Sequence, residues 1–382
     1  MRLLLSCTEL GLGHVSRLIP LGKKLAERGH ELHFFSGGAA YQLLKKEFPL
    51  VYPCRPVAWY ESAHGVLASA SFLNILFPLP RYNYESQRLE MKSPSASETI
   101  DRYYDLRRHI RRIKPDAIIA DGDMHALRLA KKWRIKAVYV TNIIRPSYSF
   151  SPLLTPGERF TERYVKRCER IIVPDIPKYT VCEYNLGNLG DMGIRDKVEF
   201  VGSFIEMTRQ RQKEESSEKK HIFASISGPL GTRAKLVNMI APVFSQLSSR
   251  CVVSLGQPGE KMVKKLGNCE IYNWLTLAER NQMMKEAGIV VFSGSHGTCF
   301  EVIKHVKPSV CIPTQPEQMA NARKLEEMQC SKMVKNGADL RSAILEIEEK
   351  RESFKANLRR LNEYASRFKG LDNAVKAIEA VA

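Results

Sequence analysis

The segment Phe292–Ala322 holds the densest set of side chains that could do chemistry. It begins at the end of an apolar run, passes through a turn of small polar residues and enters a helical pattern, and a second polar turn follows further along. Hydroxyls, an imidazole and backbone N–H groups at a helix N-terminus are suited to binding a diphosphate. The candidates in the first turn are Ser293, Gly294, Ser295, His296, Gly297 and Thr298.

Carboxylates and amides lie close behind this turn. Glu301 lies one helical turn beyond Thr298 and therefore on the same face, where a carboxylate can accept hydrogen bonds from both hydroxyls of a ribose. The alternative is structural: Thr298 and Glu301 fit a capping box, and the second turn is then an ordinary polar loop. Three residues of the second turn could hold the hydroxyls of a sugar: Glu317, Gln318 and Asn321.

A glycine-rich turn also follows the first apolar run, Arg2–Cys7, and opens the first helical pattern. Gly11 and Gly13 would let backbone N–H groups approach a ligand closely, and His14 would stand where a general base can face the carboxyl ends of the strands. A dinucleotide site is disfavoured, because Ser16 stands where that motif needs a third glycine and no carboxylate ends the second strand. The chain has no P-loop sequence either. The alternative for His14 is a histidine that merely starts a helix.

The sequence Asp121-Gly122-Asp123 follows another apolar run and precedes a helical pattern. Two such carboxylates could bind a divalent cation beside a diphosphate. The simpler account is that Asp121 ends a strand and Asp123 caps the next helix. We therefore expect no metal site here.

The chain carries 59 Lys plus Arg against 41 Asp plus Glu, and its formal net charge of +18 is spread through both halves. Such an excess favours an anionic partner: nucleic acid, an anionic membrane surface or a phosphorylated substrate. No recognisable DNA- or RNA-binding motif accompanies the charge, which argues against nucleic acid. An ordinary basic surface is the simplest alternative.

The most basic helical stretch is Asp101–Pro115. Four of its arginines are expected on one face: Arg107, Arg108, Arg111 and Arg112. They could contact anionic lipid headgroups or a pyrophosphate-linked acceptor, or be a solvated helix surface. The neighbouring apolar stretch Val66–Leu79 favours a membrane-facing loop.

Short apolar runs alternate with helical patterns, which predicts an α/β protein made of two doubly wound parallel-sheet domains. Strands are expected at Arg2–Cys7, Glu31–Phe35, Asp116–Ala120, Ala137–Val140, Ile171–Val173 and Val198–Val201 in the first half. In the second half they are expected at His221–Ile226, Cys251–Leu255, Glu270–Tyr272, Ile289–Phe292 and Ser309–Ile312.

The domain boundaries follow from composition. Thr208–Lys220 contains no aliphatic residue, so we place an N-terminal domain at 1–207, a linker at 208–220 and a C-terminal domain at 221–364. The chain from about Arg351 has an amphipathic helical pattern, and its last part, 365–382, is expected to pack back on the N-terminal domain. A long loop-like stretch from about 52 to 97 is expected to be a functional insertion.

Composition and cysteine usage indicate the cellular compartment in which the protein is expected. With 44% hydrophobic and 26% charged residues, the chain resembles an ordinary soluble protein, and no apolar run reaches the ~20 residues that span a bilayer. The N-terminus MRLLLSC is strand-like and too brief for a signal peptide. The nine cysteines are scattered without a C-x-x-C pair, which favours a reducing compartment. We therefore expect a cytoplasmic protein, with a peripheral position on the inner membrane face as an open alternative.

The two turns of 292–322, S-G-x-H-G-T-x-x-E and P-x-x-x-E-Q-x-x-N-A, resemble the donor-nucleotide motif of GT-B glycosyltransferases. Among these enzymes, the chain most resembles the MurG and UDP-glycosyltransferase-like group (family 28 and family 1 type). The turn Gly11–His14 resembles the glycine-rich loop and histidine of these enzymes. The loop Ser225–Thr232 resembles their G-S-x-G loop facing the diphosphate, although Pro229 and Leu230 depart from that pattern.

The resemblance implies two Rossmann-like domains facing each other across a cleft, with the acceptor on the first domain and a UDP-sugar on the second. It implies an inverting transfer without metal or cofactor, in which His14 takes the proton of the acceptor hydroxyl. In the plant and microbial glucosyltransferase branch an aspartate at the position of Asp121 orients this histidine. Gly11 and Gly13 would lie on the acceptor side, and Gly231 and Thr232 beside the donor.

The expected reaction is therefore the transfer of a sugar, with N-acetylglucosamine as one candidate, from a UDP-sugar to a hydroxyl acceptor in glycan biosynthesis. The basic charge favours a lipid-linked or phosphorylated acceptor and an anionic membrane surface as partners, and no nucleic acid. Two alternatives stay open. A UDP-sugar 2-epimerase of the same fold would consume the donor without an acceptor, and a nucleic-acid-binding protein would bind oligonucleotides with a steep salt dependence.

Overall fold

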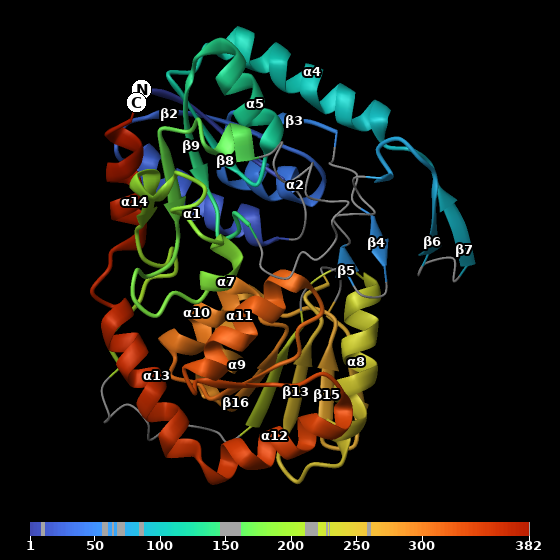
Figure 1. Ribbon diagram of the computed structural model, residues 1–382. Helices are drawn as coiled ribbons and strands as arrows, with labels where there is room; N and C mark the ends of the chain where they lie inside the picture. Colours follow the sequence, from blue (N-terminus) through green and yellow to red (C-terminus); the bar gives the residue numbers. More distant parts are fainter. Residues whose placement is uncertain are drawn as a thin grey trace.

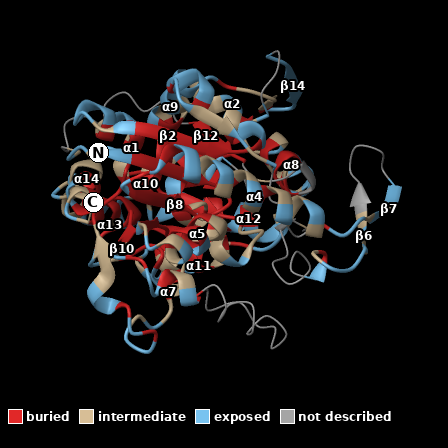
Figure 2. Cartoon of the chain, turned by 90° about the horizontal axis from the view of Figure 1, so that it is seen from above, coloured by how far each residue is buried: buried red, intermediate tan, exposed pale blue. Residues whose placement is uncertain are grey.

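The protein is built around two seven-stranded sheets, each covered by helices on both faces and lying one above the other in Figure 1. The computed structural model describes residues 1–8, 12–55, 60–62, 65–66, 73–83, 88–145, 162–210, 221–226, 228, 230–257 and 261–381. Buried residues concentrate in the strands and on the inner sides of the helices (Figure 2).

The first sheet is entirely parallel, in the order β11-β10-β9-β8-β1-β2-β3. The winding reverses between β1 and β8, and ligands of such sheets bind at this switch point, outside the carboxyl ends of the strands. The strands are β1 (Arg2–Cys7), β2 (Glu31–Ser36), β3 (Val51–Pro53), β8 (Ala117–Asp121), β9 (Lys136–Val140), β10 (Arg170–Val173) and β11 (Val198–Phe200).

Alternate residues of β1 point to opposite faces of this sheet, and each face has its own hydrophobic core. Leu3 and Leu5 pack in the core that includes α1 (Gly13–Glu27), whereas Leu4 packs in the core that includes α4 (Ala96–Ile113) and α5 (Met124–Trp133). The start of α1 is therefore held directly beyond the carboxyl end of β1. Further elements of this half are α2 (Gly38–Glu47), α7 (Glu183–Leu186) and the short helix Arg195–Lys197.

The second sheet has the order β14-β15-β13-β12-β16-β17-β18, with only the edge strand β14 antiparallel to its neighbour. Its switch point lies between β12 and β16, so β12 and β16 present their following turns at one place. The strands are β12 (His221–Ser225), β13 (Cys251–Ser254), β14 (Val263–Leu266), β15 (Cys269–Tyr272), β16 (Ala287–Phe292), β17 (Ser309–Cys311) and β18 (Ser331–Met333). The helices are α8 (Leu230–Ser245), α9 (Leu277–Glu286), α10 (His296–Lys304), α11 (Pro316–Glu327), α12 (Gly337–Glu349) and α13 (Arg351–Ala365).

The end of the chain returns from the second half to the first. Helix α13 packs against α10, and the following helix, α14 (Gly370–Glu379), packs against α1 (Figure 1). Gly370 makes this return possible, because a Cβ there would lie 2.0 Å from the carbonyl oxygen of Ser203. The start of the expected linker is tied to α13, since Asn362 hydrogen-bonds the backbone of Thr208 and Gln210. Residues 211–220 of that linker lie outside the described residues.

The doubly wound fold class is as expected, but the sequence prediction missed the short edge strands β3, β14 and β18. Apart from the buried Ser331, their few residues are half-buried or exposed, so they carry no continuous apolar run. The stretch 52–97, expected to be loop-like, holds two small hairpins: β4 (Glu61–Ser62) with β5 (Gly65–Val66), and β6 (Leu79–Asn83) with β7 (Arg88–Lys92). The β6–β7 hairpin projects from the body of the molecule (Figures 1 and 2).

None of the nine cysteines, all of which the structure describes, forms a disulfide, and eight of them are buried. Burial raises the pKa of the thiols of Cys7, Cys168 and Cys311 to about 12, so these groups pack as small protonated side chains. Among the described helices, none combines the length and the apolar character needed to cross a bilayer.

Candidate active site

His14 lies in the first turn of α1, just beyond the switch point of the first sheet. Its ring nitrogen Nδ1 is 2.6 Å from Oδ1 of Asp121, the last residue of β8. The Asp121 side chain is wholly buried, whereas that of His14 is 23% exposed. An ionised carboxylate only accepts hydrogen bonds, and its contact with Nδ1 is shorter than the 3.1 Å between Nδ1 and the donor Nη2 of Arg17. The shorter contact assigns the proton of the neutral imidazole to Nδ1 and leaves a lone pair on Nε2. No described residue hydrogen-bonds Nε2.

Arg17, one turn further along α1, binds the same carboxylate with two N–H groups. Its Nε donates to Oδ2 of Asp121 at 2.7 Å and its Nη2 to Oδ1 at 2.6 Å. Burial acts to raise the pKa of Asp121, but the charges and hydrogen bonds of Arg17 and His14 prevail and lower it below its usual range. Asp121 is therefore ionised, as the tautomer of His14 requires.

The remaining donor of Arg17, Nη1, begins a series of hydrogen bonds to the other half of the molecule. Nη1 of Arg17 donates to Oδ1 of Asn142 at 2.9 Å, and Nδ2 of Asn142 donates to Oε1 of Glu317 at 2.7 Å. Asn142 follows β9 of the first sheet, and Glu317 lies in the first turn of α11 beside the second sheet. A continuous chain of polar contacts thus joins the His14–Asp121 pair to the second polar turn of the motif.

The first polar turn of the motif connects β16 to α10. Gly294 has a positive φ of +84°, and a Cβ there would lie 2.6 Å from the carbonyl oxygen of Gln318, so only glycine fits. Ser293 is buried, and Ser295 precedes α10, where its hydroxyl donates to that of the buried Thr298 at 2.9 Å. The capping box considered for Thr298 and Glu301 does not form. A Cβ on Gly297 would meet nothing within 4 Å, so the start of α10 is open there.

Glu301 pairs with an arginine that no motif indicated. Arg280 of α9 donates two hydrogen bonds of 2.6 Å to its two carboxylate oxygens, and it also donates to the hydroxyl of Ser225 at the end of β12. Burial acts to lower the pKa of Arg280, but the charge and hydrogen bonds of the Glu301 carboxylate prevail and raise it. The pair fixes the carboxylate between the carboxyl ends of β12 and β16. Each oxygen keeps a lone pair for a further donor.

All three residues predicted to hold a sugar have hydrogen-bond partners inside the fold, and two of them are buried. Asn321 is wholly buried: Nδ2 donates to the carbonyl oxygen of Gly294, and Oδ1 accepts from Asn185 of α7, both at 3.0 Å. Asn321 therefore locks the motif together and is not free for a ligand, which corrects its predicted role. Gln318 accepts from Thr314 through Oε1, so its amide nitrogen is the part left for a ligand.

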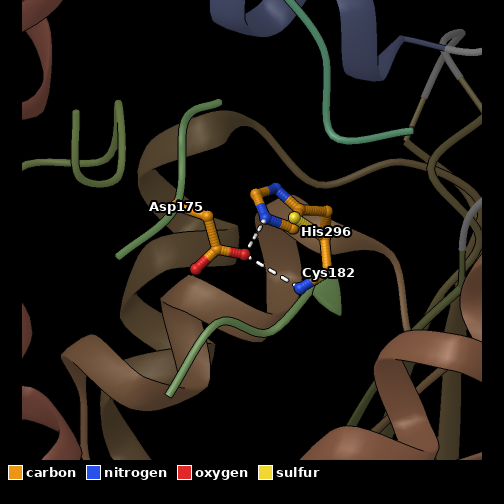
Figure 3. A group of neighbouring side chains, drawn as sticks. All are labelled: Asp175, Cys182 and His296. Carbon is orange, nitrogen blue, oxygen red and sulfur yellow. Dashed lines mark hydrogen bonds and ion pairs between the residues drawn. The ribbon is translucent and has the colours of Figure 1, made fainter. Parts of the chain in front are cut away.

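His296 was predicted to turn its imidazole to a diphosphate, but the ring is buried and points to the other half of the molecule. Its Nε2 lies 3.0 Å from Oδ2 of Asp175, which follows β10, and Cys182 lies beside them (Figure 3). This geometry gives no support to a ligand contact by the ring. It leaves the backbone N–H groups at the start of α10 as donors for an anion.

The group Asp175, Cys182 and His296 has ligand atoms within 4.8 Å of one another, as a metal site would. Its hydrogen bonds argue against that use. Besides His296, the two oxygens of Asp175 accept from the backbone N–H groups of Ile176, Val181 and Cys182. Burial raises the pKa of the Cys182 thiol well above its ordinary value, so no thiolate is present. The group is a structural contact between the two halves.

The glycine-rich loops are described only in part. Gly11 lies outside the described residues, whereas Gly13 is the first residue of α1 with open space around its Cβ position. In the loop after β12, Gly228 has a positive φ of +115°, and Gly231 and Thr232 lie in the first turn of α8. Thr232 is wholly buried, and its Oγ1 has no hydrogen-bond partner among the described residues.

The sequence has clear relatives. Residues 236–373 match the glycosyltransferase family 28 C-terminal domain. An uncharacterized glycosyltransferase of Methanosarcina acetivorans is 25% identical over 344 residues, which cover 84% of this chain and 82% of the relative. Another from Methanosarcina mazei is 23% identical over 335 residues, with the same coverage.

The fold has clear relatives among solved structures. MurG of Acinetobacter baumannii superposes with a TM-score of 0.62 at 14% identity and covers 99% of each chain. The glycotransferase of kitacinnamycin superposes with a TM-score of 0.68 at 15% identity, over 99% of this chain and 98% of the other. This protein is a GT-B glycosyltransferase. The fold and the enzyme class predicted from the sequence are confirmed, and the match to the family 28 model lies in residues 236–373.

In this glycosyltransferase the two aspartates of Asp121-Gly122-Asp123 serve separate purposes. Asp121 binds His14 and Arg17, as described above. Asp123 caps α5 as expected and also binds the buried Arg102 of α4 at 2.8 Å. Burial acts to raise the pKa of Asp123, but Arg102 and the hydrogen bonds around it lower the value to about 2. The carboxylates are thus not arranged as a pair for a cation.

The arginines of α4 and His14 lie at opposite ends of the strands of the first sheet. Helix α4 runs back to the amino end of β8, whereas His14 lies beyond the carboxyl ends of the strands. Arg108, Arg111 and Arg112 are exposed and Arg107 is half-buried. This placement disfavours a contact between the four arginines and a pyrophosphate bound next to His14, and it leaves a membrane surface or solvent.

Sequence reasoning missed the partners of the predicted residues: Arg17, Asn142, Asp175 and Arg280. One signal was available for Arg17, because it follows His14 by three residues on a helix and a buried carboxylate needs a positive partner. Asn142 and Arg280 come from elements without any motif, so only the tertiary structure brings them in.

The contact between Asp175 and His296 leads to a stability prediction. Asp175→Asn should lower the free energy of unfolding by about 2–5 kcal/mol, because an amide NH₂ would face buried backbone donors. Urea denaturation measures this, with Asp191→Asn on the exposed surface as the control. Dialysis of the parent protein against EDTA should leave its midpoint unchanged. A large loss of stability on chelation would mean that the cluster is a metal site after all.

Proposed function

We propose that this glycosyltransferase is an inverting enzyme that moves a sugar from a UDP-sugar to a hydroxyl group of a lipid-linked acceptor, with N-acetylglucosamine as one candidate sugar. The observation that carries the proposal is the chain of contacts from His14 through Asp121, Arg17 and Asn142 to Glu317. It joins a base on the first half to a carboxylate in the motif of the second.

His14 would act as the general base on the acceptor hydroxyl. Its Nε2 keeps the lone pair and takes the proton as the hydroxyl oxygen attacks the anomeric carbon. Asp121 holds the ring in this tautomer and stabilises the imidazolium that forms. The leaving diphosphate departs from the opposite side of the anomeric carbon, which inverts its configuration.

The donor would lie along the turn between β16 and α10. Backbone N–H groups at Gly297 and the helix N-terminus stabilise the charge that develops on the diphosphate, so no metal ion is required. Glu301, oriented by Arg280, accepts the ribose hydroxyls. Glu317 offers its second carboxylate oxygen, Oε2, to a sugar hydroxyl, because no described residue donates to it. Gly231 and Thr232 at the start of α8 face the same switch point.

A nucleotide-sugar panel tests this function. Thermal shifts should single out UDP-sugars over other nucleotide sugars, and thymidine diphosphate sugars belong in the panel because the related rhamnosyltransferase SpnG is known in complex with thymidine diphosphate. Transfer is then measured on polyprenyl-phosphate-linked acceptors. Donor consumption that needs no acceptor would favour the epimerase alternative.

A membrane surface is the partner that we propose for the outer side of α4. Ile100, Tyr104, Arg108 and Arg112 follow one another at four-residue spacing, and all are exposed. This stripe begins near the segment with Leu76 and Phe77, which are 68% and 57% exposed. Apolar side chains followed by cations suit the interface of an anionic bilayer.

Donor binding should depend on Glu301. Glu301→Ala should weaken UDP binding about 10-fold or more, since each charge-assisted hydrogen bond is worth roughly 1.5–3 kcal/mol. Isothermal titration with UDP measures this, and Glu349→Ala at the exposed end of α12 is the control. Unchanged affinity in a folded Glu301→Ala variant would show that the ribose site is elsewhere.

Transfer should depend on His14 without a comparable effect on the donor. His14→Ala should keep UDP affinity and lose about 10²–10⁴-fold in single-turnover transfer, since the base is gone. Because the pKa of Asp121 is lowered, that carboxylate stays ionised and keeps the ring oriented in the parent protein. Asp121→Asn should give a weaker form of the defect. Near-normal transfer by a folded His14→Ala variant would exclude this base.

Membrane association should depend on the arginines of α4. Replacing Arg107, Arg108, Arg111 and Arg112 by Glu should strongly reduce co-sedimentation with anionic liposomes, because each basic residue near such a surface contributes about 1 kcal/mol. UDP affinity should not change, since these residues lie far from the donor turn. Binding that persists at low salt would identify the arginines as ordinary surface.

A further inference from the structure

We propose that Arg17 and Asn142 are positioning residues that fix the distance between the base His14 and the sugar-binding carboxylate Glu317. The proposal rests on the proposed function for the roles of His14 and Glu317, and it assigns a role to two residues outside the motifs. Arg17 and Asn142 act through their neighbours and touch neither substrate.

The orientation of the Asn142 amide is determined by its two partners. Arg17 has only donors, so the atom of Asn142 that it meets must be the carbonyl oxygen. The NH₂ group of the amide then faces Glu317, whose Oε1 accepts the hydrogen bond. Donor and acceptor therefore match at every step between Asp121 and Glu317. The reversed amide would place two donors and two acceptors against each other.

The bridge uses more of Arg17 than the neutralisation of Asp121 requires. Nε and Nη2 already form the two-pronged contact with the carboxylate. Nη1 is the third direction of the planar guanidinium, and it alone reaches Asn142. Lysine has a single point of contact and could not hold Asp121 and Asn142 in fixed relative positions. If Arg17 served only as a counter-ion, the contact with Asn142 would have no function.

The bridge also determines which part of Glu317 is open. Oε1 accepts from Asn142, and among the described residues nothing donates to Oε2. A sugar hydroxyl would therefore meet Oε2 on a carboxylate that is already oriented from the acceptor side. The same contacts then position the base, which belongs to the first half, and the sugar-binding carboxylate, which belongs to the second. Small displacements matter here, since a misplacement of about 1 Å can cost 10²-fold in rate.

The first experiment separates positioning from nucleotide binding. Asn142→Leu should bind free UDP within about 2-fold of the parent, because the diphosphate and ribose contacts are intact. The tighter binding of UDP-sugar relative to UDP should be lost, and kcat should fall about 10- to 100-fold. Asn357→Leu on α13, a half-buried amide with hydrogen bonds of its own, is the control. An Asn142→Leu variant with parental kcat and sugar preference would overturn the proposal.

The second experiment needs no substrate. Asn142→Asp sets two carboxylates against each other, and Glu317→Gln added to it restores a donor facing an acceptor with the direction reversed. In thermal unfolding without nucleotide, the double variant should have a higher midpoint than Asn142→Asp alone. If the two substitutions change the unfolding midpoint strictly additively, the bridge does not form. If the parent binds no nucleotide sugar, the proposed function fails. The comparison of unfolding midpoints would still test whether the bridge forms.

Discussion

The buried carboxylate of Asp121 is the group on which the arrangement of this enzyme depends. An ionised carboxylate without water must have positive or donating partners, and here both come from α1, as His14 and Arg17. The three-residue spacing of these partners sets the rotation of α1 about its axis, and Asp121 at the end of β8 sets its position. The same contact keeps the proton of His14 on Nδ1. Fold stability and the direction of the free lone pair of His14 therefore have one physical origin.

The two halves are joined by polar contacts that involve the motif itself. His296 binds Asp175, Asn321 binds Asn185, and Glu317 binds Asn142. Each contact pairs a motif residue of the second half with a residue at the carboxyl side of the first sheet. The motif therefore serves two purposes: some of its groups hold the halves together, and others, such as the backbone at Gly297 and the second oxygen of Glu317, remain for a ligand. Residue type alone does not separate these purposes, because a carboxamide or imidazole suits either.

The sequence was sufficient for the alternation of strands and helices, the doubly wound fold, and the positions of both polar turns at strand ends. These depend on apolar runs such as Ile289–Phe292 and on glycines such as Gly294, which are local features. It was not sufficient for the short edge strands β3, β14 and β18, whose residues, apart from Ser331, are only partly covered. Nor did it reveal Asn142 and Arg280, since no local pattern brings them to the site, or the direction of the His296 ring, which depends on a strand of the other half.

The contact with Asp121 holds the proton of His14 on Nδ1, which leaves Nε2 as the base in the mechanism that we propose. Nitrogen NMR of the protein with ¹⁵N-labelled histidine, recorded where the imidazole is neutral, measures this tautomer directly, and the His14→Ala variant assigns the signal. The account predicts a protonated Nδ1 and an unprotonated Nε2 for His14, with loss of that preference in Asp121→Asn. A neutral His14 with its proton on Nε2 in the parent protein would contradict the account.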